Sequence, residues 1–131
     1  HVALFAKALD SVVRPVLLSL SPGAQDIWRG SWKQYVPYAN MIRVTPDAWD
    51  YDSTNFLKLQ RWYEFEELSG PALWANLDML PLGALQVTTP QTKPTEQGAA
   101  RQNNLTPLGK KTMMTIFAMS CSPLIFGGDL P

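Results

Sequence analysis

The sequence has few of the residues that most often bind metals or form nucleophile–base pairs. Its 131 residues include one cysteine and one histidine. The lone Cys121 excludes an internal disulfide, and a single cysteine with a single histidine argues against a zinc site. The histidine is the first residue, so no imidazole is placed to activate Ser19 or Ser21, and a Ser-His-Asp triad is disfavoured. We therefore expect no metal and no other cofactor.

Net charge and long apolar runs are also missing. The 11 basic and 11 acidic residues cancel, which leaves no electrostatic footprint for nucleic acid or an anionic membrane surface. No apolar run reaches about 18 residues, so no transmembrane helix is expected. No glycine-rich phosphate fingerprint opens a predicted helix, and no lysine stands at a predicted strand end, which disfavours nucleotide-binding and Schiff-base enzymes. The chain lacks an initial Met and a basic leader, and we expect it to be a fragment of a longer chain.

Helical and strand patterns alternate along the chain. Helices are predicted over residues 2–13, 25–35, 54–67 and 106–120, and strands over residues 16–21, 40–44, 73–80 and 123–126. Thr106 and Pro107 are typical of a helix start, because a hydroxyl N-cap precedes Pro at the first helical position. Residues 84–104 form a polar connection that is long for a compact domain, so it is either functional or disordered.

This alternation predicts an α/β fold whose parallel strands follow the order of the sequence. Four strands correspond to half of a closed barrel or to part of a doubly wound sheet, because a complete eight-stranded barrel needs about 250 residues. We expect apolar faces of the helices to pack on this sheet. They are Leu4, Phe5, Ala8, Leu9 and Val12 in the first helix, Phe56, Leu59, Tyr63 and Phe65 or Leu68 in the third, and Met113 or Met114, Ile116, Phe117 and Met119 in the last.

An arginine stands at the end of the second predicted strand, and an aspartate follows it. Arg43 stands at its end, and Asp47 comes four residues later. A carboxylate just past a strand end, beside an arginine that helps to set its position and charge, is suited to general acid catalysis. The alternative is an ordinary solvated salt bridge in a loop. The pair alone leaves both interpretations open.

A second carboxylate, Asp78, lies in an otherwise apolar segment. Burial without a partner is costly, so we expect Asp78 to be paired, hydrogen-bonded to loop amides or placed at a cavity mouth. Its neighbour Met79 either lines a pocket or fills the core, and the spacing favours the core. Trp49 and Trp74 are close in sequence to the two carboxylates, and their aromatic faces are suited to stacking on sugar rings.

Taken in order, these segments resemble the C-terminal half of the catalytic barrel of family 27 glycoside hydrolases, the α-galactosidases and α-N-acetylgalactosaminidases. Strand six of that family, Asn-x-x-Arg-x-x-x-Asp, is similar to Asn40, Arg43 and Asp47. Strand seven, Gly-Pro-x-x-Trp-x-x-x-Asp-Met-Leu, is similar to residues 70–80. The likeness extends to strand five and to the last helix and strand, at residues 14–23 and 106–130.

The resemblance implies that residues 1–131 are one partial domain, strands five to eight of a (β/α)8 TIM barrel. It implies a retaining hydrolase of α-linked galactose-type sugars, with Asp47 as the general acid/base. Arg43 is then a ligand of substrate hydroxyls and a partner of the carboxylates. The predicted substrate-binding residues are Arg43, Ser21, Trp74, Asp78 and Met79.

The nucleophile of such enzymes follows strand four, which this sequence lacks, and Asn76 stands where an acidic residue is commoner. Retaining glycosidases need two carboxyls about 5–5.5 Å apart, and a lone acid contributes roughly 10²–10⁴-fold. We therefore expect the chain alone to be nearly inactive. Its partners would be a carbohydrate and either the N-terminal half of the barrel or a second copy, joined through exposed strand edges. Two alternatives stay open: a non-catalytic carbohydrate-binding or assembly module, and a barrel enzyme of another chemistry.

Overall fold

A computed structural model describes residues 1–23, 30–66, 70, 73–86 and 98–129. Its helices are α1 (Val2–Asp10), η1 (Ser31–Tyr35, a 3₁₀ helix), α3 (Ser53–Phe65) and α4 (Pro107–Met119). Its strands are β1 (Ser19–Leu20), β2 (Met41–Arg43), β3 (Trp74–Asn76), β4 (Met79–Leu80), β5 (Ala84–Leu85), β6 (Arg101–Gln102) and β7 (Ile125–Phe126). The predicted mixed α/β structure with parallel sheet elements is confirmed.

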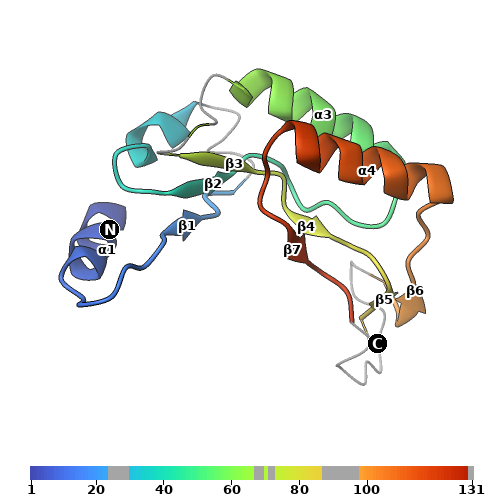
Figure 1. Cartoon of the computed structure of the whole chain (residues 1–131), viewed down its shortest axis with the longest axis horizontal. Helices are drawn as coiled ribbons and strands as arrows, with labels where there is room; N and C mark the ends of the chain where they lie inside the picture. Colours follow the sequence, from blue (N-terminus) through green and yellow to red (C-terminus); the bar gives the residue numbers. More distant parts are fainter. Residues whose placement is uncertain (24–29, 67–69, 71–72, 87–97, 130–131) are drawn as a thin grey trace.

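The strands form an arch that α3 and α4 cover on its outer side (Figure 1). β1 pairs with β2, and β2 with β3, all in parallel. Further along the arch, β4 pairs in parallel with β7. Neighbouring parallel strands therefore follow one another in sequence order, as the alternating pattern predicted, and their carboxyl ends lie at one edge of each sheet.

The expected strand over residues 73–80 is in fact two strands, and the expectation of one continuous four-stranded sheet is wrong. Asp78 adopts a left-handed backbone conformation with φ of 72°. An extended strand needs a negative φ, so the ladder cannot continue through this residue. β3 consequently pairs with β2, whereas β4 pairs with β7 in a separate sheet.

The main core lies between α3, α4 and the strands beneath them. Its buried members are Val44, Phe65, Ala75, Leu77, Leu80, Leu105, Met113, Ile116 and Phe117. In α4 the prediction is largely confirmed, since Met113 rather than Met114 is buried and Thr106 caps the helix by accepting a 2.9 Å hydrogen bond from the Gly109 amide. Met119 is exposed, contrary to expectation.

The predicted inner face of α3 is wrong except at Phe65, and Leu68, the alternative to Phe65, lies outside the described residues. Phe56 and Tyr63 are 74% and 73% exposed, and the buried residues of the helix are Asn55, Lys58, Arg61 and Phe65. The inner face of α3 meets backbone carbonyls at the break between β3 and β4, and Lys58 donates to those of Leu77 and Met79, which favours a polar residue on this face. The periodicity of the sequence alone cannot show which of the two stripes of the helix is buried.

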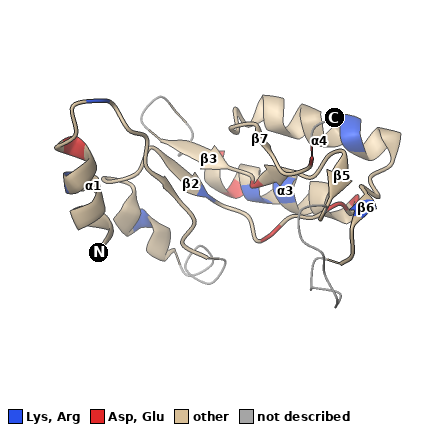
Figure 2. Cartoon of the chain, turned by 90° about the horizontal axis from the view of Figure 1, so that it is seen from below, with Lys and Arg blue, Asp and Glu red and all other residues tan. Residues whose placement is uncertain are grey.

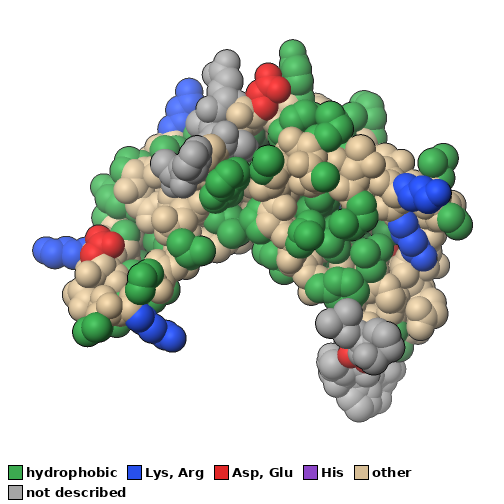
Figure 3. Space-filling view, in the orientation of Figure 1, with side chains coloured by type: hydrophobic (Ala, Val, Ile, Leu, Met, Phe, Trp, Pro, Cys, Tyr) green, Lys and Arg blue, Asp and Glu red, His purple; other side chains and the backbone are tan. Residues whose placement is uncertain are grey.

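The N-terminal part of the chain has less regular secondary structure than predicted. α1 ends at Asp10 rather than near residue 13, and β1 contains only Ser19 and Leu20. Of the predicted helix 25–35, η1 forms the end, and residues 25–29 lie outside the described residues. No residue of α1 is buried. Figure 3 shows hydrophobic side chains over this end of the arch and along its hollowed side.

The polar connection over residues 84–104 contains more order than predicted at its two ends. β5 and β6 form a short antiparallel pair there. Residues 87–97 lie outside the described residues. Within the described part of the chain, no helix has the length and apolar character needed to cross a membrane.

Candidate active site

Arg43 and Asp47 meet at the end of β2. Arg43 closes the strand, and Nη2 of its guanidinium lies 2.6 Å from Oδ1 of Asp47. The Asp47 side chain is 64% exposed, whereas that of Arg43 is 21% exposed. Asp47 is therefore open to a ligand while its carboxylate is held by a cation that is mostly covered.

Asp78 joins this pair from the break between β3 and β4. Its Oδ1 lies 3.4 Å from Nη1 of Arg43, and its Oδ2 accepts a 2.9 Å hydrogen bond from the amide of Ala48, the residue after Asp47. Both carboxylate oxygens of Asp78 thus have partners, and the side chain is 16% exposed. This matches the expectation of a paired carboxylate bound to a loop amide. Figure 2 shows basic and acidic segments close together where β2, β3 and α3 meet.

Sheet register places Trp74 on the same face as Arg43. Met41 pairs with Trp74, and Arg43 with Asn76. Residues two apart on a strand, and residues in register on its neighbour, point to the same side. The amide Nδ2 of Asn76 lies 3.5 Å from the sulfur of Met41, which agrees with a common face. Trp74 therefore stands one strand away from the charged cluster, on its side of the sheet.

The other two predicted site residues lie on opposite sides of the charged cluster, after β1 and at the start of β4. Ser21 follows β1, is exposed, and lines a hollow of about 180 Å³ with Leu20, Pro22, Val2 and Tyr35. Met79 opens β4, and its side chain packs so closely on Gly127 that a Cβ there would collide with it. The structure thus brings Arg43, Asp47 and Asp78 into contact, whereas Ser21 lines the hollow beside β1 and the side chain of Met79, the residue after Asp78, packs on Gly127.

A buried ion pair fixes the loop that carries Asp47, and sequence reasoning missed it. Asp50 is fully buried and accepts hydrogen bonds from both Nε and Nη2 of Arg101 and from the amide of Asn104. Burial would raise the pKa of Asp50, but the hydrogen bonds from Arg101 and Asn104 outweigh it and hold the pKa below its ordinary value. The partners are 51 residues apart in sequence, and no local pattern marks such a pair.

Lys58 is the second residue that the sequence analysis missed. It lies on the buried face of α3 with no exposed surface, and its Nζ donates to the carbonyls of Leu77 and Met79. Burial lowers the pKa of Lys58 to about 8, and nearby Arg43 adds to this, while Asp78 opposes it. The available signal was the polar stripe of α3 at helical spacing, which competed with a more apolar stripe.

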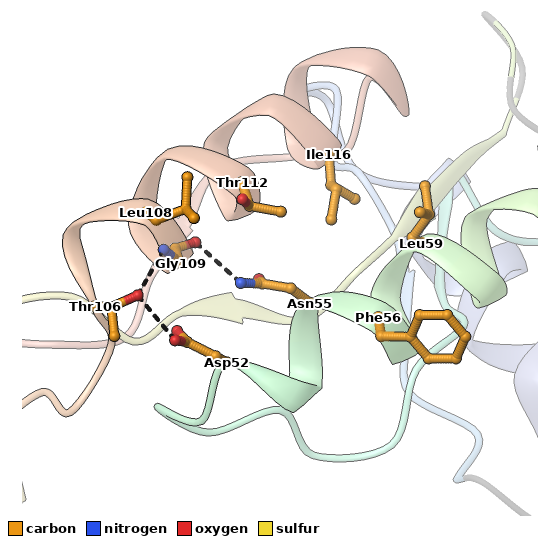
Figure 4. A pocket seen from close by; sticks show the side chains of 9 residues that line it. All are labelled: Asp52, Asn55, Phe56, Leu59, Thr106, Leu108, Gly109, Thr112 and Ile116. Carbon is orange, nitrogen blue, oxygen red and sulfur yellow. Dashed lines mark hydrogen bonds between the residues drawn. The ribbon is translucent and has the colours of Figure 1, made fainter.

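The groove between α3 and α4 is a different feature (Figure 4). It has a volume of about 330 Å³, and Phe56, Leu59 and Leu108 are among its apolar walls. Asn55 crosses it by donating to the Gly109 carbonyl at 2.9 Å. A Cβ at Gly109 would collide with Asp52, so glycine allows the helices to approach closely. None of the predicted site residues lines this groove, and its contacts explain helix packing rather than chemistry.

The charged cluster is suited to proton transfer and to binding hydroxyl groups. Asp47 has an exposed carboxylate, whereas Asp78 uses both oxygens internally. Arg43 presents a fork of donors between them, the geometry that suits oxygen ligands. Among the described residues there is no group of three or more His, Cys, Asp or Glu side chains placed to hold a metal ion.

Comparison with solved structures identifies relatives of the whole arrangement. Two structures of a family 27 β-L-arabinopyranosidase from Geobacillus stearothermophilus, one of them a variant in complex with arabinose, match with a TM-score of 0.80 and 33% identity. A candidate α-N-acetylgalactosaminidase from Bacillus halodurans C-125 matches with a TM-score of 0.66 and 28% identity.

Each match covers 97% of this chain but 28% of the other protein. No family model and no curated protein matched. The resemblance read from the motifs is confirmed by this likeness in structure and sequence: the chain is a partial homologue of the family 27 glycoside hydrolases.

Proposed function

We propose that residues 1–131 are strands five to eight of a (β/α)8 barrel in a retaining glycoside hydrolase, with Asp47 as its general acid/base. The observation that carries this proposal is the contact of Arg43 with Asp47 and Asp78 at neighbouring parallel strand ends, in a chain related to glycosidases. In such barrels, catalytic residues stand at the carboxyl ends of the strands.

In this mechanism Asp47 acts twice. It protonates the glycosidic oxygen as the leaving group departs, and it then removes a proton from the water that attacks the glycosyl-enzyme. Its exposure allows contact with substrate, and Arg43 fixes its orientation through the 2.6 Å contact. The nucleophile would come from the part of the barrel outside this chain, about 5–5.5 Å from Asp47 across the scissile bond.

The strand edges support a partner that completes the barrel. In the described residues, β1 and β7 are each paired on one side, and the apolar residues beside them are open. Leu17 is 74% exposed, Leu124 64% and Phe126 43%. Unpaired edges flanked by apolar side chains favour addition of further strands, so we propose that the N-terminal half of the same barrel covers them.

Two sugars are proposed for the pocket. The α-galactoside is the substrate class that the sequence motifs imply. A β-L-arabinopyranoside is the second candidate, because the two neighbouring structures at 33% identity are of one β-L-arabinopyranosidase. β-L-Arabinopyranose has the ring configuration of α-D-galactopyranose but lacks the exocyclic hydroxymethyl group. Residues 1–131 would therefore bind the shared hydroxyls through Arg43 with Trp74 as a sugar platform, and Ser21, Asp78 and Met79 would shape the pocket.

The acid/base assignment is tested with Asp47→Asn in the full-length protein. We expect kcat/KM for glycosides with poor leaving groups to fall by roughly 10²–10⁴-fold. Activated aryl glycosides should lose less in their first step, because their departure needs no proton. Added azide should release an α-configured glycosyl azide, since it displaces the enzyme carboxylate with a second inversion. Glu66→Gln, at an exposed carboxylate at the end of α3, is the matched control.

An equal loss for good and poor leaving groups, with no azide adduct, would contradict the assignment and leave Asp47 as a salt-bridge partner of Arg43. Sugar binding by calorimetry without hydrolysis of either glycoside by the wild-type protein would instead support a non-catalytic carbohydrate-binding module. The ratio of kcat/KM for the p-nitrophenyl α-D-galactopyranoside and β-L-arabinopyranoside decides between the two substrates.

A further inference from the structure

Lys58 is a buried cation that the proposed mechanism does not use. Its side chain has no exposed surface, and its Nζ lies 4.9 Å from the centre of the Phe117 ring. Taking an ammonium group out of water is costly, and an apolar side chain of the same length would avoid that cost. The contacts of the ammonium group should therefore explain why a lysine occupies this position.

The ammonium group holds the backbone on both sides of Asp78. Nζ donates to the carbonyl of Leu77, and it lies 3.3 Å from the carbonyl of Met79. Asp78 stands between these two residues with φ of 72°, and its own amide donates to Oδ1 of Asn76 at 2.7 Å. A left-handed aspartate is uncommon and persists when surrounding contacts determine it. Lys58 supplies two of those contacts.

Asp78 transmits this backbone geometry to the charged cluster. Its two carboxylate oxygens bind Arg43 and the amide of Ala48, and Arg43 binds Asp47. A change in the direction of the Asp78 side chain would therefore move both the arginine and the loop next to Asp47. A displacement of about 1 Å in a catalytic group reduces rates by up to roughly 10²-fold.

We propose that Lys58 is a positioning residue, which fixes the left-handed turn at Asp78 and through it the placement of Arg43 and Asp47. The inference rests on the proposed glycosidase function for its kinetic consequence, but its geometric part stands on the contacts alone. Lys58 touches no substrate in this scheme, because it reaches the turn from the helix side of the strands.

The test uses the full-length protein with Lys58→Met, which keeps the length of the side chain, and Lys58→Gln, which keeps a neutral donor. The matched control is Lys111→Met, at an exposed lysine of α4. We expect Lys58→Met to lower kcat/KM by roughly 10- to 100-fold per folded molecule, with KM raised because Arg43 is misplaced. Lys58→Gln should recover part of this loss, and the control should stay within about twofold.

Two further measurements separate positioning from a general loss of packing. Lys58→Met added to Asp78→Asn should reduce kcat/KM little beyond Asp78→Asn alone, since both act along one chain of contacts. In ¹⁵N-arginine-labelled protein, the side-chain resonance assigned by Arg43→Lys should shift in Lys58→Met and shift less in Lys58→Gln. If Lys58→Met does not fold, Lys58→Gln carries the same comparison with wild type.

A folded variant with kcat/KM within about twofold of wild type and an unmoved Arg43 resonance would overturn the inference, as would fully additive effects of the two substitutions. The proposed function fails separately. If the wild-type protein hydrolyses neither glycoside, the glycosidase assignment is wrong, and the Arg43 resonance still decides whether Lys58 positions the cluster.

Discussion

The first and last helices of the chain are both predicted to be amphipathic, yet their packing differs. α4 buries Gly109, Met113, Ile116 and Phe117 against α3 and the strands. α1 buries nothing, and Leu4 and Phe5 on it are 69% and 67% exposed. α4 packs beside α3 and over the strands beneath it, whereas α1 stands at the end of the arch (Figure 1).

This difference agrees with the proposal that further elements of a longer protein cover the apolar face of α1. The apolar face of α4 packs on neighbouring elements and forms core, whereas that of α1 stays exposed among the described residues. Under the proposed function, the same part of the barrel would cover both the exposed face of α1 and the open edge of β1. The core under α3 and α4 forms within residues 1–131 themselves.

The largest expected effect contrasts two phenylalanines. Phe117→Ala removes a ring that is 1% exposed, and should lower the free energy of unfolding by about 3–5 kcal/mol. Phe5→Ala should change it by less than about 0.5 kcal/mol in the 131-residue chain. In the full-length protein, where the N-terminal half would cover α1, Phe5→Ala should cost more. Urea unfolding of both variants in both chains measures this, and equal costs in the short chain would show that α1 is already packed there.

A smaller effect concerns how the free energy of unfolding depends on pH through Lys58, on the buried face of α3. The folded-state pKa of Lys58 is lowered to about 8 from an ordinary value of 10.5, chiefly by burial. Between these two values the unfolded chain binds a proton that the folded protein does not, so the free energy of unfolding rises with pH. The rise should be on the order of 3 kcal/mol in total, and Lys58 should add no pH dependence to the free energy of unfolding well below pH 8.

The measurement is the difference in unfolding free energy between wild type and Lys58→Met from pH 7 to 10.5. Subtraction removes the titration of the exposed lysines and tyrosines that both proteins share. A constant difference would mean that Lys58 keeps an ordinary pKa in the folded protein, which would contradict its burial.

The smallest expected effect concerns the helix ends. Thr106 caps α4 through its hydroxyl, whereas α1 has no side-chain cap. Thr106→Ala should lower the free energy of unfolding by about 1 kcal/mol, and Thr106→Ser should restore most of it because the hydroxyl returns. Thermal unfolding of the three proteins checks this, and an unchanged midpoint for Thr106→Ala would show that the first turn of α4 frays in solution.

The sequence predicts local features better than long-range ones. The start of α4 is predictable because Thr106 and Pro107 act within one turn. The parallel order follows from the alternation of elements, and the Arg43–Asp47 contact follows from a spacing of four residues. The Asp50–Arg101 pair, the division of the strand at Asp78 and the inward turn of Lys58 depend on partners distant in sequence. No local period encodes them.

The two cations and two carboxylates that meet around Asp78 sum to no net charge near neutral pH. Arg43 and Lys58 balance Asp47 and Asp78, so the field of the group decays within a short distance. A neutral sugar would therefore not be drawn to this edge of the arch by long-range steering, and added salt would screen little. Recognition at such a site depends on hydrogen bonds and ring contacts made after arrival. Under the proposed function, such contacts would form only once the rest of the barrel is in place.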